Sequence, residues 1–255
     1  MGASLVRGVL GSGLLPADQV TVADVDGAKR RELAERYGVH ETRDNAEAAT
    51  RSQVTVLAVK PRQVRQVLEE MAPKLTPGHT IISIAAGVKL SSLAEVVRSD
   101  VNLVRVMPNS PALVGQAVSA IAPAPGTGED AVSKAKAIFG AVGDTVEIPE
   151  ELLDAVTAVS GSGPAYFYLF VEALTDAAVD LGLPREIAQR LSVGTLVGSG
   201  AMLRETGKHP AVLRDMVTSP GGTTIAALAE FESKGLRGAV WQGVWAAYRR
   251  AKELG

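Results

Sequence analysis

The chain has 255 residues, is 46% hydrophobic and carries a formal net charge of −2, which predicts a folded protein with room for two domains. So small a net charge argues against nucleic acid or an anionic membrane as a partner. The absence of cysteine excludes disulfides, thiolate nucleophiles and sulfur-ligated zinc, and it favours a reducing, cytoplasmic location. No segment has the uninterrupted apolar length of a membrane span.

A helical pattern begins with the first residues of the chain, and no strand pattern precedes it. In a dinucleotide-binding unit, a strand and a Gly-x-Gly-x-x-Gly turn come before the helix that holds the pyrophosphate. Gly2 fits the last glycine of that turn, and Asp24 follows the next strand roughly 20 residues on, where an acidic residue meets the ribose.

We therefore expect a Rossmann-like domain without its first strand and first two glycines. We also expect the natural protein to carry about ten more residues ahead of Met1, which its intact mass would reveal. The alternative is a dehydrogenase-like domain that begins with a helix.

Short β-branched runs alternate with helical patterns up to about residue 149. The runs predict strands at residues 20–25, 54–59, 80–85, 102–107, 118–122 and 145–148. The 3.6-residue periodicity between them predicts helices at residues 28–37, 62–71, 90–97 and 130–139. Strands that are apolar on nearly every residue are typical of a mostly parallel sheet with helices on both faces. We expect residues 1–149 to form a doubly wound α/β domain.

After Pro149 the strand patterns stop, and residues 150–255 are expected to form an all-α domain. The helical patterns cover residues 167–181, residues 185–206 and a stretch that carries Trp241, Val244, Trp245 and Tyr248. A domain this short and this apolar is expected to bury surface against a second copy of the chain, as a homodimer or larger homo-oligomer. The alternative is that the apolar stripes form the domain's own core. The two interpretations are compatible, because some stripes can form the core while others form the interface.

The three histidines, His40, His79 and His209, lie far apart in the sequence, and each adjoins a turn signal. We expect them at the surface, and we expect no histidine-based metal site or catalytic triad.

The segment Ser219-Pro220-Gly221-Gly222-Thr223-Thr224 runs directly into an apolar helical pattern. A helix start leaves backbone N–H groups without partners and carries about half a positive charge, so it binds a carboxylate or phosphate without a basic side chain. Gly221 and Gly222 permit close approach to the backbone, and Thr223 and Thr224 add hydroxyls. The alternative is a Pro-Gly turn before a capped helix.

A set of short motifs runs along almost the whole chain. They are Asp44-Asn45, Ala58-Val59-Lys60-Pro61, Ile84-Ala85-Ala86-Gly87, Arg105-Val106-Met107-Pro108-Asn109-Ser110-Pro111, Ser160-Gly161-Ser162-Gly163-Pro164-Ala165-Tyr166, and Leu213-Arg214-Asp215-Met216-Val217-Thr218 leading into residues 219–224. In this order they resemble the pyrroline-5-carboxylate reductase family. The resemblance implies a Rossmann domain and a helical domain that interlocks with a partner subunit. It also implies the last reaction of proline biosynthesis, hydride transfer from NAD(P)H to the C=N carbon of 1-pyrroline-5-carboxylate.

The resemblance also implies a substrate site. The substrate carboxylate is expected on Ser219 and on the backbone N–H groups of Gly221, Gly222 and Thr223. The hydroxyl of Thr224 is expected against the ring nitrogen, as the catalytic group. A carboxylate near that nitrogen stabilises the imine cation, which makes Glu150 or Glu151 a candidate. The alternative is that Glu150 and Glu151 are solvated residues at the start of a helix.

For the cofactor, the resemblance implies contacts from residues that follow predicted strands, which are Ala58, Val59, Lys60, Pro61, Ala85, Ala86, Gly87 and Asn109, with Asn45 near the adenosine. The family favours NADP(H). Asp24 argues instead for the free ribose of NAD(H), whereas Lys29, Arg30 and Arg31 are either phosphate ligands or a solvated helix face.

Two other functions remain open from the sequence. One is another two-domain reductase, such as a 3-hydroxy-acid dehydrogenase, which relies on a helix-borne lysine in its second domain. The lysines available there, Lys208, Lys234 and Lys252, lie near predicted helix ends or in turns, which counts against this function. The other is a binding or structural relative that uses no cofactor, since the glycine turn that would bind the cofactor phosphates is incomplete.

Overall fold

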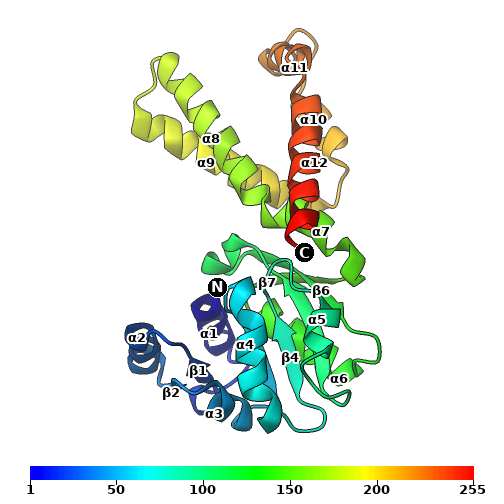
Figure 1. Ribbon diagram of the computed structural model, residues 1–255. Coiled ribbons are helices and arrows are strands. Elements are labelled where there is room, and N and C mark those ends of the chain that lie inside the picture. Colours follow the sequence, from blue (N-terminus) through cyan, green and yellow to red (C-terminus); the bar gives the residue numbers. More distant parts are fainter. The chain divides into compact units, whose positions relative to one another are not determined.

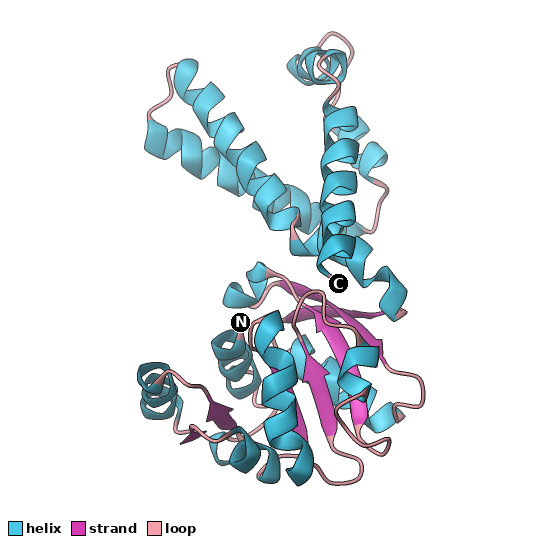
Figure 2. Cartoon of the chain, viewed as in Figure 1, coloured by secondary structure: helices cyan, strands magenta, loops and turns pink.

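The computed structural model describes residues 1–255, which divide into two compact units (Figure 1). The first comprises Met1–Ser162 and Ala247–Gly255, and the second comprises Gly163–Ala246. Strands occur only in the first unit, and the second is helical throughout (Figure 2). The first unit extends past the predicted boundary at residue 149 because Leu153 packs with Ala120 and Ala122 of the sheet. No helix is long and apolar enough to cross a membrane.

A five-stranded sheet forms the centre of the first unit. Its strands lie in the order β3 (Val54–Leu57), β4 (Thr80–Ser83), β5 (Asn102–Met107), β6 (Ala117–Pro123) and β7 (Gly143–Glu147). Neighbouring strands are parallel except for β5 and β6. The mostly parallel sheet confirms the predicted α/β class.

Helices cover both faces of this sheet (Figure 1). One face packs against α4 (Pro61–Met71) and α5 (Leu90–Ala94), and the other packs against α1 (Gly2–Gly11) and α6 (Glu129–Gly140). Successive side chains of a strand point to opposite faces, so Ile81 enters the first core and Ile82 the second. Because both positions must be apolar, the strands read as continuous hydrophobic runs rather than alternating ones.

A separate two-stranded parallel sheet lies at the start of the chain. It consists of β1 (Thr21–Ala23) and β2 (His40–Thr42), which are followed by α2 (Gly27–Tyr37) and α3 (Asn45–Thr50). Among the strands, β1 pairs only with β2 and β3 pairs only with β4. Each of these two strands therefore has one free edge.

The second unit contains α8 (Gly163–Asp180), α9 (Arg185–Thr206), α10 (Pro210–Met216), α11 (Thr223–Ser233) and the first part of α12 (Leu236–Leu254). α8 and α9 pack against each other, and the side chains of Thr175, Ala188 and Ser192 are buried. Short helical segments complete the chain, and they are η1 (Ala17–Gln19), η2 (Ala72–Lys74), η3 (Ser110–Val114), η4 (Glu150–Leu152), α7 (Leu153–Val156) and η5 (Thr157–Gly161).

The expectation of three surface histidines is wrong for His79. This residue precedes β4 directly and is 2% exposed. Its carbonyl oxygen accepts a hydrogen bond from the backbone N–H of Asn102, which draws it into the sheet, and its ring Nε2 lies 2.9 Å from the Thr55 hydroxyl.

Burial of His79 produces a testable pH dependence of stability. Desolvation lowers the pKa of its imidazole from the usual 6.5. Because the unfolded chain then binds the proton more readily, the stabilisation is complete above the unfolded-state pKa and is lost as the pH falls through the folded-state pKa. We expect His79→Gln to flatten the decline in unfolding free energy between about pH 7 and pH 5, measured by urea titration. His209→Gln, at an exposed position, is the control, and an unchanged slope in the His79 variant would contradict the expectation.

Candidate functional site

The carboxyl ends of three parallel strands meet at one edge of the five-stranded sheet. β3, β4 and β5 are paired so that Leu57, Ser83 and Arg105 stand side by side. The loops directly after these positions carry most of the residues predicted to bind the cofactor, which are Ala58, Val59, Lys60, Pro61, Ala85, Ala86, Gly87 and Asn109. An open α/β sheet binds its ligand at this edge. The structure thus brings together residues that lie far apart in the sequence.

The start of α1 contacts the same edge. A Cβ on Gly2 would lie 3.4 Å from the Cβ of Ala58, so the first turn of α1 adjoins the loop after β3. No side chain caps this helix start, and its first N–H groups carry a partial positive charge. The arrangement suits a phosphate group, which helix starts bind through backbone N–H groups.

The predicted adenosine-side residues lie in the smaller sheet region. Asp24 follows β1, and its Oδ1 accepts a hydrogen bond from the backbone N–H of Asp26 at 2.9 Å. Asn45 begins α3, and its Nδ2 donates to Glu70 Oε2 at 2.8 Å. Both side chains are held by contacts within the chain, and their roles toward a nucleotide stay predictions.

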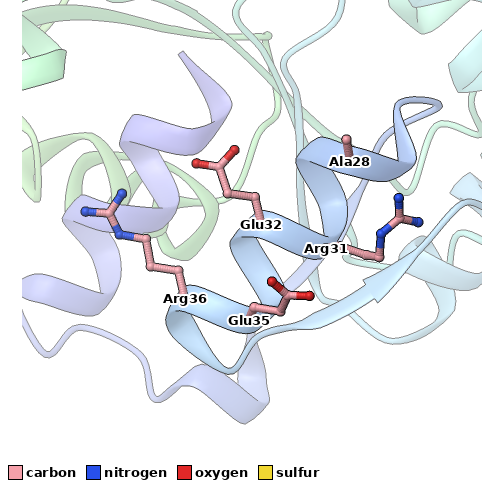
Figure 3. A pocket seen from close by; sticks show the side chains of 5 residues that line it. All are labelled: Ala28, Arg31, Glu32, Glu35 and Arg36. Atoms are coloured by element: carbon pink, nitrogen blue, oxygen red, sulfur yellow. The ribbon is translucent and has the colours of Figure 1, made fainter.

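The cations of α2 are held mainly by carboxylates of the chain. Nε of Arg30 lies 2.8 Å from Glu41 Oε2, and Nζ of Lys29 lies 3.2 Å from Asp26 Oδ2. Arg31 lines a shallow hollow on the outer side of the helix, together with Ala28, Glu32, Glu35 and Arg36 (Figure 3). All of these residues come from one helix, and they mix acidic and basic groups. This surface is a solvated helix face rather than an enclosed ligand site.

The loop between β4 and α5 contacts the last turn of α12. Gly87 has φ of +77°, and a Cβ at this position would lie 2.5 Å from the carbonyl oxygen of Leu254. Glycine is therefore required here both for the left-handed backbone and for the close approach of another chain segment. The sequence predicted Gly87 as a cofactor contact and gave no signal of its contact with Leu254.

An ion pair ties the same loop to the segment after β7. Oε1 of Glu150 accepts a hydrogen bond from the backbone N–H of Leu90 at 2.7 Å and lies 3.0 Å from Nη1 of Arg105. The Arg105 side chain is only 8% exposed, so the carboxylate neutralises a nearly buried charge. Arg105 belongs to a predicted motif and Glu150 is a predicted candidate, but no sequence pattern indicates that they pair.

Asn109 is buried at the end of this sheet edge. Its Oδ1 accepts a hydrogen bond from the backbone N–H of Val118 at 3.0 Å, which holds the start of β6 against the loop after β5. The side chain therefore has a structural partner in addition to its predicted place along the cofactor.

The loop before α11 lies in the second unit. Gly221 has φ of +70°, and the N–H of Gly222 donates to the carbonyl oxygen of Ser219 at 3.1 Å, which closes a tight turn. Gly222 is the N-cap of α11, and no side chain caps the helix. A Cβ on Gly222 would collide with the Ser219 hydroxyl. The backbone N–H groups of Thr223 and Thr224 thus stand at the free start of an 11-residue helix.

This fold and these two groups of residues define a class of protein. A mostly parallel sheet whose strand ends meet a helix start, joined to a helical unit with a second uncapped helix start, is the architecture of a two-domain dinucleotide-dependent oxidoreductase.

The comparisons with known proteins narrow this class to one family. Residues 150–254 match the family model for pyrroline-5-carboxylate reductase dimerisation, and residues 1–87 match that of NADP oxidoreductase coenzyme F420-dependent. The chain is 48% identical to a pyrroline-5-carboxylate reductase of Synechocystis, over 93% of this chain and 88% of the relative. The chain belongs to the pyrroline-5-carboxylate reductase family.

Solved structures agree with this assignment. A pyrroline-5-carboxylate reductase from Coxiella burnetii superposes with a TM-score of 0.95 at 36% identity, covering 100% of this chain and 94% of that one. A pyrroline carboxylate reductase from Plasmodium falciparum, solved with NADP bound, gives a TM-score of 0.88 at 31% identity, with the same coverage of 100% and 94%.

The ion pair between Arg105 and Glu150 allows a direct test of stability. Glu150→Ala leaves the nearly buried guanidinium of Arg105 without its carboxylate partner, and it leaves the N–H of Leu90 without its acceptor. We expect a loss of about 3 kcal/mol of unfolding free energy, at the lower end of the range for broken buried pairs because the Glu150 carboxylate is partly exposed. Denaturant unfolding measures this loss. Glu151→Ala, at the exposed neighbouring position, is the control, and equal losses in the two variants would contradict the assigned role.

Proposed function

We propose that this chain reduces 1-pyrroline-5-carboxylate to L-proline with NADPH as the favoured hydride donor. Membership in the family is the observation that carries the proposal. The bound NADP of the Plasmodium relative supports the choice of cofactor. The residues at the sheet edge and at the start of α1 would hold the dinucleotide, with Gly2 and Ala58 nearest the phosphates.

The proposed substrate carboxylate binds at the start of α11. The N–H groups of Gly221, Thr223 and Thr224 are the main-chain donors, aided by the Ser219 hydroxyl. The N–H of Gly222 serves the turn itself, because it donates to Ser219, so this residue contributes by lacking a Cβ. An anion held in this way needs no basic side chain.

We place the Thr224 hydroxyl against the ring nitrogen of the substrate. When bound, NAD(P)H supplies the hydride, which adds to the C=N carbon of the protonated imine, and the nitrogen keeps its proton as it becomes the secondary amine of proline. Thr224 orients the imine by hydrogen bonding at nitrogen. We assign Glu150 to its pair with Arg105 rather than to the substrate site, because its Oε1 accepts a hydrogen bond from the N–H of Leu90 and also pairs with Arg105.

The helical unit is proposed to pair with a second copy of the chain. Three consecutive residues of α8, Phe167, Tyr168 and Leu169, are 58%, 63% and 67% exposed. Consecutive residues of a helix point in different directions, so one neighbouring helix cannot cover all three. The match to a dimerisation family model over residues 150–254 supports a homo-oligomer formed through this unit.

The alternative of a 3-hydroxy-acid dehydrogenase gains no support from the lysines. Lys208 follows the end of α9, Lys234 caps α11, and Lys252 lies in the last turn of α12 with its ammonium 4.9 Å from the Tyr248 ring. A cofactor-free relative predicts no turnover at all. Oxidation of the reduced nicotinamide with the cyclic imine, and proline-dependent reduction of NAD(P) at high pH, test the proposal against both alternatives.

Thr224 is the residue whose loss tests the mechanism. We expect Thr224→Val to lower kcat by one to a few orders of magnitude, because the isosteric side chain cannot hydrogen-bond the imine nitrogen. Thr224→Ser keeps the hydroxyl and should retain most of the rate. Steady-state kinetics with the cyclic imine provide the measurement, and a rate in Thr224→Val equal to that of the natural chain would remove this hydroxyl from the mechanism.

The glycine turn offers a second test with a matched control. Gly221 and Gly207 have similar left-handed φ values of +70° and +60°, and neither has a neighbour within 4 Å of an added Cβ. We therefore expect alanine at either position to lower the free energy of unfolding by about 1–2 kcal/mol, through backbone strain. Only Gly221→Ala should raise the KM of the imine substrate, by about tenfold, because only this turn positions the carboxylate donors. Equal KM values in the two variants would count against the proposed anion site.

A further inference from the structure

Residues 85–90, which we call the 85–90 loop, lead from β4 to the first residue of α5 and are held at two separate points. At one point its last N–H group is held by a carboxylate from the segment after β7. At the other point Gly87 lies directly against the backbone of α12. The proposed function places Ala85, Ala86 and Gly87 along the cofactor, so whatever fixes this loop also fixes one wall of the cofactor site.

The first of these two contacts is electrostatic and involves Glu150. Glu150 Oε1 lies between the N–H of Leu90 at 2.7 Å and Nη1 of Arg105 at 3.0 Å. Arg105 is part of β5 and cannot move without the sheet, so it holds the carboxylate in place. The carboxylate in turn fixes the end of the loop relative to β5. Because the guanidinium is nearly buried, this pair has no competing solvent partner on the arginine side.

The second contact is a close steric fit between Gly87 and the end of α12. Backbone atoms of Leu254 and Gly255 surround the position that a Cβ of Gly87 would take, the nearest at 2.5 Å. The same turn of α12 is anchored in the first unit by Ala251, which is 7% exposed. A positive φ at Gly87 directs the loop into this contact.

We propose that Glu150 and the last turn of α12 are positioning elements that preorganise the 85–90 loop for the cofactor. Glu150 lies after β7, in the segment by which the first unit continues to Ser162, and α12 is the helix by which the chain returns to this unit. Two segments of the first unit that are far apart in the sequence therefore contact the same loop. The inference rests on the proposed function, because that function assigns the loop to the cofactor.

Preorganisation predicts a selective kinetic defect. When the loop is released, the bound cofactor must order it again, so affinity for NAD(P)H falls while the substrate loop before α11 is untouched. We expect the KM of NADPH to rise about 5- to 20-fold in Glu150→Ala and in a chain that stops at Glu253. The KM of the imine and kcat should stay within about twofold of the natural chain. Glu150→Gln keeps an oxygen acceptor for Leu90 and should recover most of the affinity.

The experiment compares these variants with Asp144→Asn, a substitution at an exposed position of β7 that should leave every constant unchanged. The chain that stops at Glu253 retains the pair with Arg105, so it reports on the loop even if Glu150→Ala unfolds. A cofactor KM that does not change in the folded variants would overturn the proposal, and so would an equal rise in the imine KM.

A binding measurement separates this inference from the proposed function. Titration of NADPH, followed by the fluorescence of its nicotinamide, needs no turnover. If the natural chain binds NADPH but does not reduce the imine, the proposed function fails, and the Kd values of the same variants still decide the positioning role. Weaker binding in Glu150→Ala and in the shortened chain supports that role, and equal Kd values overturn it.

Discussion

The parallel pairing of β3, β4 and β5 is the constraint on which the rest of the structure depends. With Leu57, Ser83 and Arg105 side by side, three loops must leave the sheet at one edge. Parallel strands also require crossover helices, and burial of both sheet faces fixes where these helices lie. The candidate cofactor residues are neighbours because the strands are parallel and because burial of Ile81 and Ile82 on opposite faces keeps β4 inside the sheet.

Main-chain groups rather than reactive side chains dominate the candidate site. The helix starts at Gly2 and Thr223 present N–H groups, and positive φ values at Gly87 and Gly221 shape the adjoining loops. Such a site suits a reaction in which the cofactor carries the reducing power, since the protein then needs only to hold two anionic molecules in the right orientation. This explains how a chain without cysteine, whose one fully buried histidine lies in a structural hydrogen bond, can belong to a reductase family.

The sequence predicted the sheet well where apolar runs are long. β5 has the predicted bounds, 102–107, because it is buried on both faces. The runs predicted to end at Val59 and Ala85 instead end at Leu57 and Ser83, since the apolar pattern continues into the loops at the carboxyl ends. β2 was missed because it has three residues and a polar sequence, His40–Thr42.

The site was predictable only as far as its signals were local. The turn before α11 carries its own glycines and threonines, and the sequence therefore located it. Arg105 and Glu150 are 45 residues apart, and no periodicity links a residue of a central strand to one after the last strand. Their pairing arises only in the folded chain, and so does the contact of Gly87 with a helix near the other end of the chain.

The buried arginine also explains why the segment after β7 is held where it is. A charge taken out of water costs several kcal/mol unless a fixed partner faces it, so Arg105 destabilises any arrangement in which Glu150 is displaced. An apolar contact at this position would tolerate small displacements, because it has no preferred direction. A charged pair that also binds a backbone N–H has one favoured geometry. The pair therefore fixes the position of the segment after β7 relative to β5. It does so beside the 85–90 loop, which the proposed reaction requires to be ordered.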